Sequence, residues 1–270
     1  MDIRKYTSAN RDAWNEVAPI HQNARKEDYE ELFRKKDYST LDDIITSKLI
    51  EVELEGKHVA QLCCNNGREV LSLINMGAQY GAGFDISDEA IKEANELKKS
   101  SNLNCRFICC DVYDIDSEYH NSFDLIYISI GALPWLPDIA GFFNIVSRML
   151  KTGGILVIYE SHPINDMLAC EGDKELEPDN PFKPVYSYFK DDPWIENDGI
   201  DYIGKTIYKS KTTYCFHHKL SDIFNAVIKG GIAITEFTEY PHDISNGFEH
   251  IQDKKIFPLC YILIGKKSIQ

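Results

Sequence analysis

The sequence has few basic residues for its acidic content. It holds 29 lysines and arginines against 43 aspartates and glutamates, which gives a formal net charge of -14 at pH 7. Such a charge repels the phosphate backbone of nucleic acids and the surface of anionic membranes. We therefore expect neither a nucleic-acid partner nor a membrane partner.

The sequence also lacks a long apolar run and an N-terminal secretion signal. No stretch is apolar over enough residues to cross a bilayer, and no basic segment followed by an apolar one opens the chain. These absences favour the cytoplasm, where thiols stay reduced.

Cysteine spacing gives no sign of a metal site. The adjacent pairs among the eight cysteines, Cys63–Cys64 and Cys109–Cys110, lack the two-residue gap of a zinc knuckle. Their positions indicate buried thiols in core strands, and we expect no metal.

From His58 onward the sequence alternates short apolar runs with amphipathic stretches. Hydrophobic residues make up 43% of the chain, enough for a sizeable core. The alternation is typical of a doubly wound α/β fold with a parallel sheet. The apolar runs start at His58, Tyr80, Cys105, Phe123 and Gly154, and the helices between them are expected near Arg68–Met76, Ser87–Lys99, after Asp111 and at Asp138–Leu150.

Two further regions flank or interrupt this alternation. Helices are expected at about Ser8–His21 and from Ser39, which forms a capping pair with Asp42, to about Ile50. Residues 161–216 are rich in proline and aromatic residues and predict an inserted lid, the alternative being a poorly ordered loop. The expected strands of the lid are Pro184–Phe189 and Gly204–Phe216, and a helix at Leu220–Lys229 and strands at Ile232–Glu239 and Phe257–Gly265 follow it.

This organisation predicts three units. They are a helical cap at residues 1–55, a main domain at residues 56–160 and 217–270, and the lid at residues 161–216.

The most informative segment is Val59–Glu69, which reads VAQLCCNNGRE. An apolar strand, a tight turn and a helix start follow one another, an arrangement over which nucleotide-type ligands bind. Gly67 is the only glycine of the turn, but asparagines enter left-handed conformations more readily than most residues. A dinucleotide fingerprint needs glycines at 63, 65 and 68, where Cys63, Asn65 and Arg68 stand. The pattern therefore disfavours NAD and FAD.

Two aspartates follow the next two strands. Asp85 lies 18 residues after Gly67 and is placed to accept hydrogen bonds from ribose hydroxyls. Asp111, followed by Val112, is placed to meet an adenine ring. Either aspartate alone is more often a solvated or capping residue, but their joint position on successive strand ends favours a ligand site.

The segments VAQLCCNNG, GFDIS, CDVYD, FDLIYISIGALPWL, LKTGGILVIYE and PLCYILIGKK together resemble class I S-adenosylmethionine-dependent methyltransferases over essentially the whole chain. The resemblance implies a Rossmann-like three-layer sandwich with a mostly parallel seven-stranded sheet that ends in an antiparallel hairpin. It also implies S-adenosyl-L-methionine as the cofactor. The family usually has G-x-G-x-G after an acidic residue, whereas this chain has Gln61 in the acid's place and the C-x-N-x-G pattern of a less common subgroup.

The resemblance also assigns roles to particular residues. It places the methionine portion over the first turn, the ribose at the second-strand acid, the adenine at the third-strand acid and the sulfonium above Ser129. Tyr6, Trp14 and His21 lie in a segment that resembles the family's variable cap and would close over the bound methionine or the acceptor. The alternative is that Tyr6 and Trp14 simply pack this helix on the domain. The cofactor-binding residues carried over are Gln61, Cys63, Asn65, Gly67, Asp85, Ile86, Asp111, Val112 and Ser129.

Methyl transfer is an in-line displacement that depends mainly on alignment in a dry site, and a base is needed only for an amine or hydroxyl acceptor. His162, directly after the fifth strand, is the first candidate base, and Tyr127 and Glu160 are weaker ones. His217 and His218 are interpreted as structural or gate residues.

The expected activity is methyl transfer to nitrogen, oxygen or carboxylate of a small molecule. Trp194 and other lid aromatics would line the acceptor pocket, which suits a planar or cationic molecule. The alternatives are a non-catalytic module that binds the same cofactor and, less favoured by the turn, a nicotinamide-dependent oxidoreductase. The oligomeric state stays open between monomer and dimer.

Overall fold

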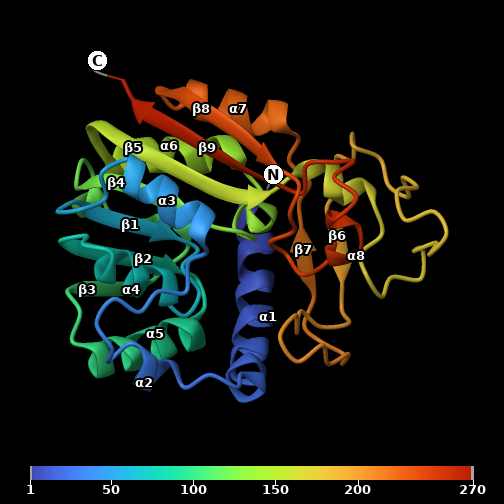
Figure 1. Cartoon of the computed structure of the whole chain (residues 1–270), viewed down its shortest axis with the longest axis horizontal. Coiled ribbons are helices and arrows are strands. Elements are labelled where there is room, and N and C mark those ends of the chain that lie inside the picture. The colour runs from blue at the N-terminus through green and yellow to red at the C-terminus, as the bar shows by residue number, and fades with distance from the viewer. Residues whose placement is uncertain (1, 269–270) are drawn as a thin grey trace.

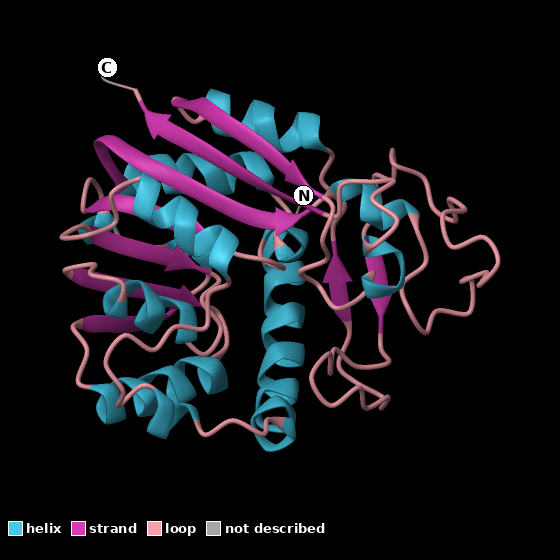
Figure 2. Ribbon diagram, viewed as in Figure 1, coloured by secondary structure: helices cyan, strands magenta, loops and turns pink. Residues whose placement is uncertain are grey.

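The computed structural model describes residues 2–268 and contains a central seven-stranded sheet with helices on both faces (Figures 1 and 2). The strand order is β3-β2-β1-β4-β5-β9-β8, and β9 runs antiparallel to both of its neighbours. This confirms the expected Rossmann-like fold with a terminal antiparallel hairpin. The strands are β1 (His58–Leu62), β2 (Tyr80–Asp85), β3 (Cys105–Cys109), β4 (Phe123–Ile128), β5 (Leu150–Ser161), β8 (Ile232–Tyr240) and β9 (Cys260–Lys267).

Both faces of the sheet are buried, which is why its strands read as nearly continuous apolar runs. Along β1, Ala60 and Leu62 belong to the core shared with α6 and α7, whereas Val59 packs on the opposite face with α3. The main helices are α1 (Ile3–Ala24), α3 (Asp43–Glu51), α4 (Arg68–Asn75), α5 (Asp88–Ser101), α6 (Ile139–Met149) and α7 (Leu220–Lys229), and the shorter ones are α2 (Tyr29–Leu32) and α8 (Glu249–Gln252).

The start of α3 differs from the expected capping pair. Asp42 is itself the N-cap, and its Oδ1 accepts from the backbone N–H groups of Ile44 and Ile45 at 2.9 and 3.0 Å. Ser39 instead accepts from the N–H of Leu41 at 3.1 Å. Helix α3 buries Ile45 and Leu49 against the sheet, so it is part of the helical layer on that face.

Helix α1 is the element that covers the functional edge of the sheet. The parallel strands point their carboxyl ends at it, and it stands between the sheet and the inserted segment (residues 161–216), as Figure 1 shows. It contacts α5 on one side and β7 (Thr213–Cys215) on the other. Ligands of open α/β sheets bind outside these carboxyl ends, so α1 lies over the place where a ligand is expected.

The inserted segment has less regular structure than the sequence predicted. Its two strands, β6 (Trp194–Glu196) and β7, form a separate antiparallel sheet. The expected strand at Pro184–Phe189 is wrong, because the N–H groups of Val185 and Tyr186 both donate to the carbonyl of Met167 and the chain then turns. Within the expected strand Gly204–Phe216, only Thr213–Cys215 forms a strand. Short 3-10 turns lie at Val112–Asp114, Ser117–Tyr119, Leu133–Trp135 and Pro163–Met167.

Two further observations concern the cysteines and membrane segments. All eight cysteines are free, and Cys109 is exposed, which corrects the expectation that it is buried. Within residues 2–268, none of the helices combines the length and the apolar character that a bilayer crossing requires.

Candidate active site

The turn after β1 has the backbone of a glycine-rich loop although it contains one glycine. Cys63, Asn65 and Gly67 have φ of 58°, 48° and 74°, all in the left-handed region. These are the three positions at which the resemblance expected glycine. A Cβ on Gly67 would lie 2.3 Å from Phe107 Cε1, so this position has no space for a side chain.

Asp85 joins the end of β2 to this turn. Its Oδ2 accepts from the N–H of Asn65 at 2.7 Å and its Oδ1 accepts from the N–H of Ser87 at 2.9 Å. Burial raises the pKa of the carboxyl group, and the backbone N–H donors oppose that rise. Each carboxylate oxygen can accept a further hydrogen bond, so the group holds the turn and can still bind a ligand hydroxyl.

Asp111 lies at the end of β3 beneath the first turn of α1. Its Oδ1 accepts from the N–H of Tyr113 at 3.0 Å, and its Oδ2 lies 3.3 Å from Arg4 Nη1 of α1. Arg4 also pairs with Asp114. Val112, the next residue, is buried, and Ile86, which follows Asp85, is half-buried. The ion pairs of Arg4 thus hold the start of α1 over the strand ends.

Glu69 occupies a position that sequence reasoning missed. Its Oε2 accepts from Ser129 Oγ at 2.5 Å and from the amide of Gln61, whose Nε2 also lies 3.0 Å from Ser129 Oγ. Burial raises the pKa of the Glu69 carboxyl. Helix α4 therefore brings a carboxylate to the side chain of Gln61, where the related family usually has an acid on the strand itself.

The carboxyl edge is strongly acidic around Cys63. Burial raises the pKa of this thiol well above its ordinary value, and the charges of Asp85, Asp111 and Glu160 raise it further. The negative charges of three carboxylates thus influence the same residue of the turn. Such an environment favours a cationic ligand and disfavours a phosphate-bearing one.

Glu160 holds the loop after β4. Its carboxylate accepts from the N–H groups of Gly131, Ala132, Leu133 and Ser161 at 2.7–3.2 Å. Burial nevertheless raises its pKa to about 7. Tyr127 is 1% exposed in the core shared with α3. Of the two weaker base candidates, Glu160 is therefore hydrogen-bonded to the backbone and Tyr127 is buried in the core.

His162 lies at the end of β5, as predicted, and each of its ring nitrogens has a polar neighbour, although Nε2 makes no hydrogen bond among the described residues. Nδ1 accepts from the N–H of Ile164 at 3.1 Å, and Nε2 lies 3.0 Å from Glu239 Oε1. Burial lowers its pKa, and Glu239 opposes that shift. These contacts favour a structural role for His162, whose assignment as a base stays a prediction.

The aromatic residues of α1 join the sheet edge to the inserted segment. Tyr6 packs edge-on against Tyr214 with 4.9 Å between ring centroids, and Trp14 packs edge-on against Trp135 at 5.3 Å. Buried His21 places Nε2 3.1 Å from the carbonyl oxygen of Ile200. The three predicted cap residues thus contact the inserted segment or the loop after β4. Trp194, the predicted acceptor contact, lies in β6.

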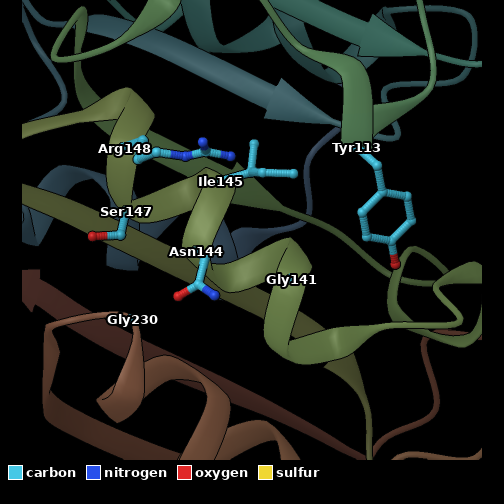
Figure 3. Close-up of a pocket in the computed structure, with 7 residues that line it drawn as sticks. All are labelled: Tyr113, Gly141, Asn144, Ile145, Ser147, Arg148 and Gly230. Atoms are coloured by element: carbon cyan, nitrogen blue, oxygen red, sulfur yellow. The ribbon is translucent and has the colours of Figure 1, made fainter. Parts of the chain in front are cut away.

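A separate open pocket of about 510 Å³ runs along α6 (Figure 3). Its lining residues come from α6, from Tyr113 and from Gly230 after α7. None of the candidate cofactor residues lines it, so it is distinct from the edge described above.

Comparison with known proteins places this geometry in a family. Residues 53–215 match the model of a methyltransferase domain. An uncharacterised protein of Methanocaldococcus jannaschii is 36% identical over 64 residues, which are 24% of this chain and 29% of that protein. The chain thus matches less than a third of the length of this curated relative.

Solved structures share the fold at low sequence identity. A putative S-adenosylmethionine-dependent methyltransferase of Listeria monocytogenes has a TM-score of 0.61 at 20% identity, with 83% of this chain and 97% of that chain covered. Magnesium protoporphyrin IX methyltransferase of Synechocystis, solved with bound S-adenosylhomocysteine, has a TM-score of 0.58 at 14% identity, with 97% and 99% covered. Since the family model spans more than half of the sequence, this chain belongs to the methyltransferase domain family.

Proposed function

We propose that this chain binds S-adenosyl-L-methionine at the carboxyl edge of β1–β4 and transfers its methyl group to a small molecule. S-adenosylmethionine is the methyl donor named for solved methyltransferases of this fold. Its sulfonium and ammonium groups are both positive. The observation that carries the proposal is the turn after β1, whose backbone is left-handed at Cys63, Asn65 and Gly67 and which is bonded to the carboxylate of Asp85 at the next strand end.

The residues of this edge fit the cofactor part by part. The left-handed backbone at Cys63, Asn65 and Gly67 allows the methionine portion to approach the turn closely. Asp85 would accept from the ribose hydroxyls, and Asp111 would accept from the adenine amino group. Ile86 and Val112 would line the ring, and Ser129 would lie beneath the sulfonium. When bound, the cofactor supplies an electrophilic methyl group.

The carboxylate of Glu69 provides the anionic partner for the cofactor's ammonium. It lies at the turn that would hold the methionine portion, fixed by Ser129 and by the amide of Gln61. The buried Oε1 of Gln61 has no hydrogen-bond partner among the described residues, which leaves an acceptor for a further N–H group.

The surroundings of the edge support a small acceptor. Helix α1 and the inserted segment both lie over it, and the acidic chain disfavours nucleic acids. Trp194 and the neighbouring Tyr186, whose ring centroids are 6.2 Å apart, would form an aromatic wall for an acceptor that carries nitrogen, oxygen or a carboxylate. Covering elements of this kind exclude water and align the reacting atoms.

Calorimetric titration of the full chain tests the cofactor assignment. We expect S-adenosylmethionine and S-adenosylhomocysteine to bind and NAD not to bind, because the turn and its carboxylates disfavour a pyrophosphate. Failure of both adenosyl compounds to bind would overturn the proposal. Binding without methyl transfer from labelled cofactor to any small acceptor would favour a non-catalytic module.

Glu69→Gln tests the ammonium contact. The change keeps the shape of the side chain but removes its charge, and we expect at least about tenfold weaker binding of S-adenosylhomocysteine, the scale of one lost charge-assisted hydrogen bond. Methylthioadenosine retains adenine and ribose but has no ammonium, so its affinity should stay unchanged.

Glu118→Gln, an exposed change in the turn before β4, is the matched control and should alter neither affinity. Equal weakening of both ligands by Glu69→Gln would mean that the variant distorts the turn, and the ammonium assignment would be wrong.

A further inference from the structure

His217 has one ring nitrogen fixed and the other without a partner. It lies two residues after β7, its side chain is 0% exposed, and its Nδ1 lies 2.7 Å from Asp166 Oδ2. Its buried Nε2 has no hydrogen-bond partner among the described residues. Buried polar atoms are nearly always hydrogen-bonded, so an unpartnered one in a cofactor-dependent fold indicates the place of a ligand atom.

The contact with Asp166 defines the protonation of the ring. A carboxylate is an acceptor, so Nδ1 must carry the proton that it donates. In the neutral ring, Nε2 is then an acceptor with a free lone pair. This arrangement is that of a base whose orientation is set by a carboxylate.

Two other histidines near this edge, His218 and His21, differ from His217 in this respect. The Nε2 of His218 lies 2.8 Å from the carbonyl oxygen of Leu136, and that of His21 lies 3.1 Å from the carbonyl oxygen of Ile200. The Nε2 of His162, like that of His217, makes no hydrogen bond among the described residues, but Glu239 Oε1 lies 3.0 Å from it. His218 and His21 thus have a carbonyl acceptor, and His162 a carboxylate, beside the nitrogen that His217 leaves free.

Aromatic side chains surround the ring of His217. Tyr188 packs edge-on with 5.2 Å between ring centroids, and Trp194 packs edge-on at 6.2 Å. The hydroxyl of Tyr188 accepts from the N–H of Leu220 at 3.2 Å, which fixes that ring. Flat aromatic walls of this kind suit a planar ligand.

The backbone beside His217 is bonded to the loop after β4. The N–H of its neighbour Phe216 donates to the carbonyl of Pro134 at 2.7 Å. Pro134 belongs to the loop that starts after β4 at Ser129, the residue assigned to the floor beneath the sulfonium. The same loop is held by Glu160. The backbone thus joins the histidine to the loop at which the methyl group would be presented.

We infer that His217, oriented by Asp166, is the general base and that the acceptor is a hydroxyl or amine on a planar ring. This inference rests on the proposed function. The acceptor's proton passes to Nε2 of His217, and its oxygen or nitrogen lone pair forms the bond to the methyl carbon. The carbon–sulfur bond breaks with its electron pair left on sulfur. The imidazolium is stabilised by Asp166 and later returns the proton to water. A carboxylate acceptor needs no base, so a base at this position restricts the acceptor to a hydroxyl or an amine.

The tautomer of His217 tests the inference without an acceptor. In the full chain labelled with ¹⁵N-histidine and saturated with S-adenosylhomocysteine, the signals missing in His217→Asn identify this ring. At a pH high enough to keep the ring neutral, we expect the proton on Nδ1, and a mixture of tautomers in Asp166→Asn. A proton on Nε2 in the unmodified chain would overturn the inference.

Turnover gives the second test. With labelled S-adenosylmethionine and a panel of phenols, catechols and aromatic amines, His217→Asn should lower kcat by at least about 100-fold, the range for loss of a general base. Calorimetric affinity for S-adenosylmethionine should be unchanged, which separates this result from a failure of the cofactor assignment. Full kcat in His217→Asn would overturn the inference.

Two variants complete the experiment. Asp166→Asn should lower kcat at an unchanged KM, because Asp166 positions the base without touching the acceptor. If Asp166 had only a structural role, the variant would lose stability but the tautomer of His217 would not change. His120→Asn, in the turn before β4 and far from the carboxyl edge in the sheet, is the control and should keep full activity.

Discussion

Asp85→Asn is expected to weaken binding of S-adenosylmethionine by at least about 100-fold, or about 2.7 kcal/mol. The carboxylate holds the N–H of Asn65 at 2.7 Å and is the proposed acceptor for the ribose hydroxyls. An amide offers one oxygen in place of two and presents an N–H₂ group to one of its donors, so the turn and the ribose contact are both impaired.

The affinity for methylthioadenosine distinguishes Asp85→Asn from Glu69→Gln. Methylthioadenosine retains the ribose, so Asp85→Asn should weaken methylthioadenosine as strongly as S-adenosylmethionine in calorimetric titration. Asp116→Asn, an exposed change at the N-cap of a 3-10 turn, serves as the control and should bind both ligands normally. Undiminished affinity in Asp85→Asn would show that the ribose is not bound here.

Gly67→Ala is expected to lower the free energy of unfolding by about 2–4 kcal/mol, from left-handed strain and overpacking combined. The new Cβ would meet Phe107 Cε1 and Cζ at 2.3 and 2.4 Å and Ala94 Cβ at 3.0 Å. These atoms belong to the packed core beneath the turn, which cannot move without disturbing α5. Urea unfolding, followed by circular dichroism, measures the change.

Gly56 provides a matched control for this substitution. It has the same φ of 74° but no heavy atom within 4 Å of the added Cβ. Gly56→Ala therefore carries the backbone strain alone and should cost about 1 kcal/mol. If the two variants lost equal stability, the steric contact with Phe107 would have no effect, and the requirement for glycine at position 67 would be purely conformational.

The regular part of the fold could be predicted from the sequence because its signals are local and repeated. Each of β1 to β5 is a short apolar run, and α7 at Leu220–Lys229 has the bounds that its amphipathic pattern predicted. The inserted segment could not be predicted in the same way. At Pro184–Phe189 the residues favour a strand, but their N–H groups bond to Met167, a contact with no local signal.

The candidate site was predicted in part for the same reason. Asp85 and Asp111 follow strands, so the sequence places them at one edge. Glu69 reaches Gln61 across the turn, and His217 reaches Asp166 from 51 residues away. Both contacts depend on how distant segments pack, and histidine or glutamate at such positions has no distinguishing pattern.

The position of β9 constrains the order in which the molecule can be assembled. This strand comes later in the sequence than β5 and β8 but lies between them and pairs with both. During synthesis from the N-terminus, β8 therefore has no partner in the sheet until residues 260–267 have left the ribosome. The half of the sheet that binds the proposed cofactor, β1 to β4, has all of its own strand pairs much earlier. In a nascent chain, β1 to β4 would thus already be paired while the edge of β5 that later bonds to β9 is still exposed. An exposed strand edge of this kind can pair with other chains.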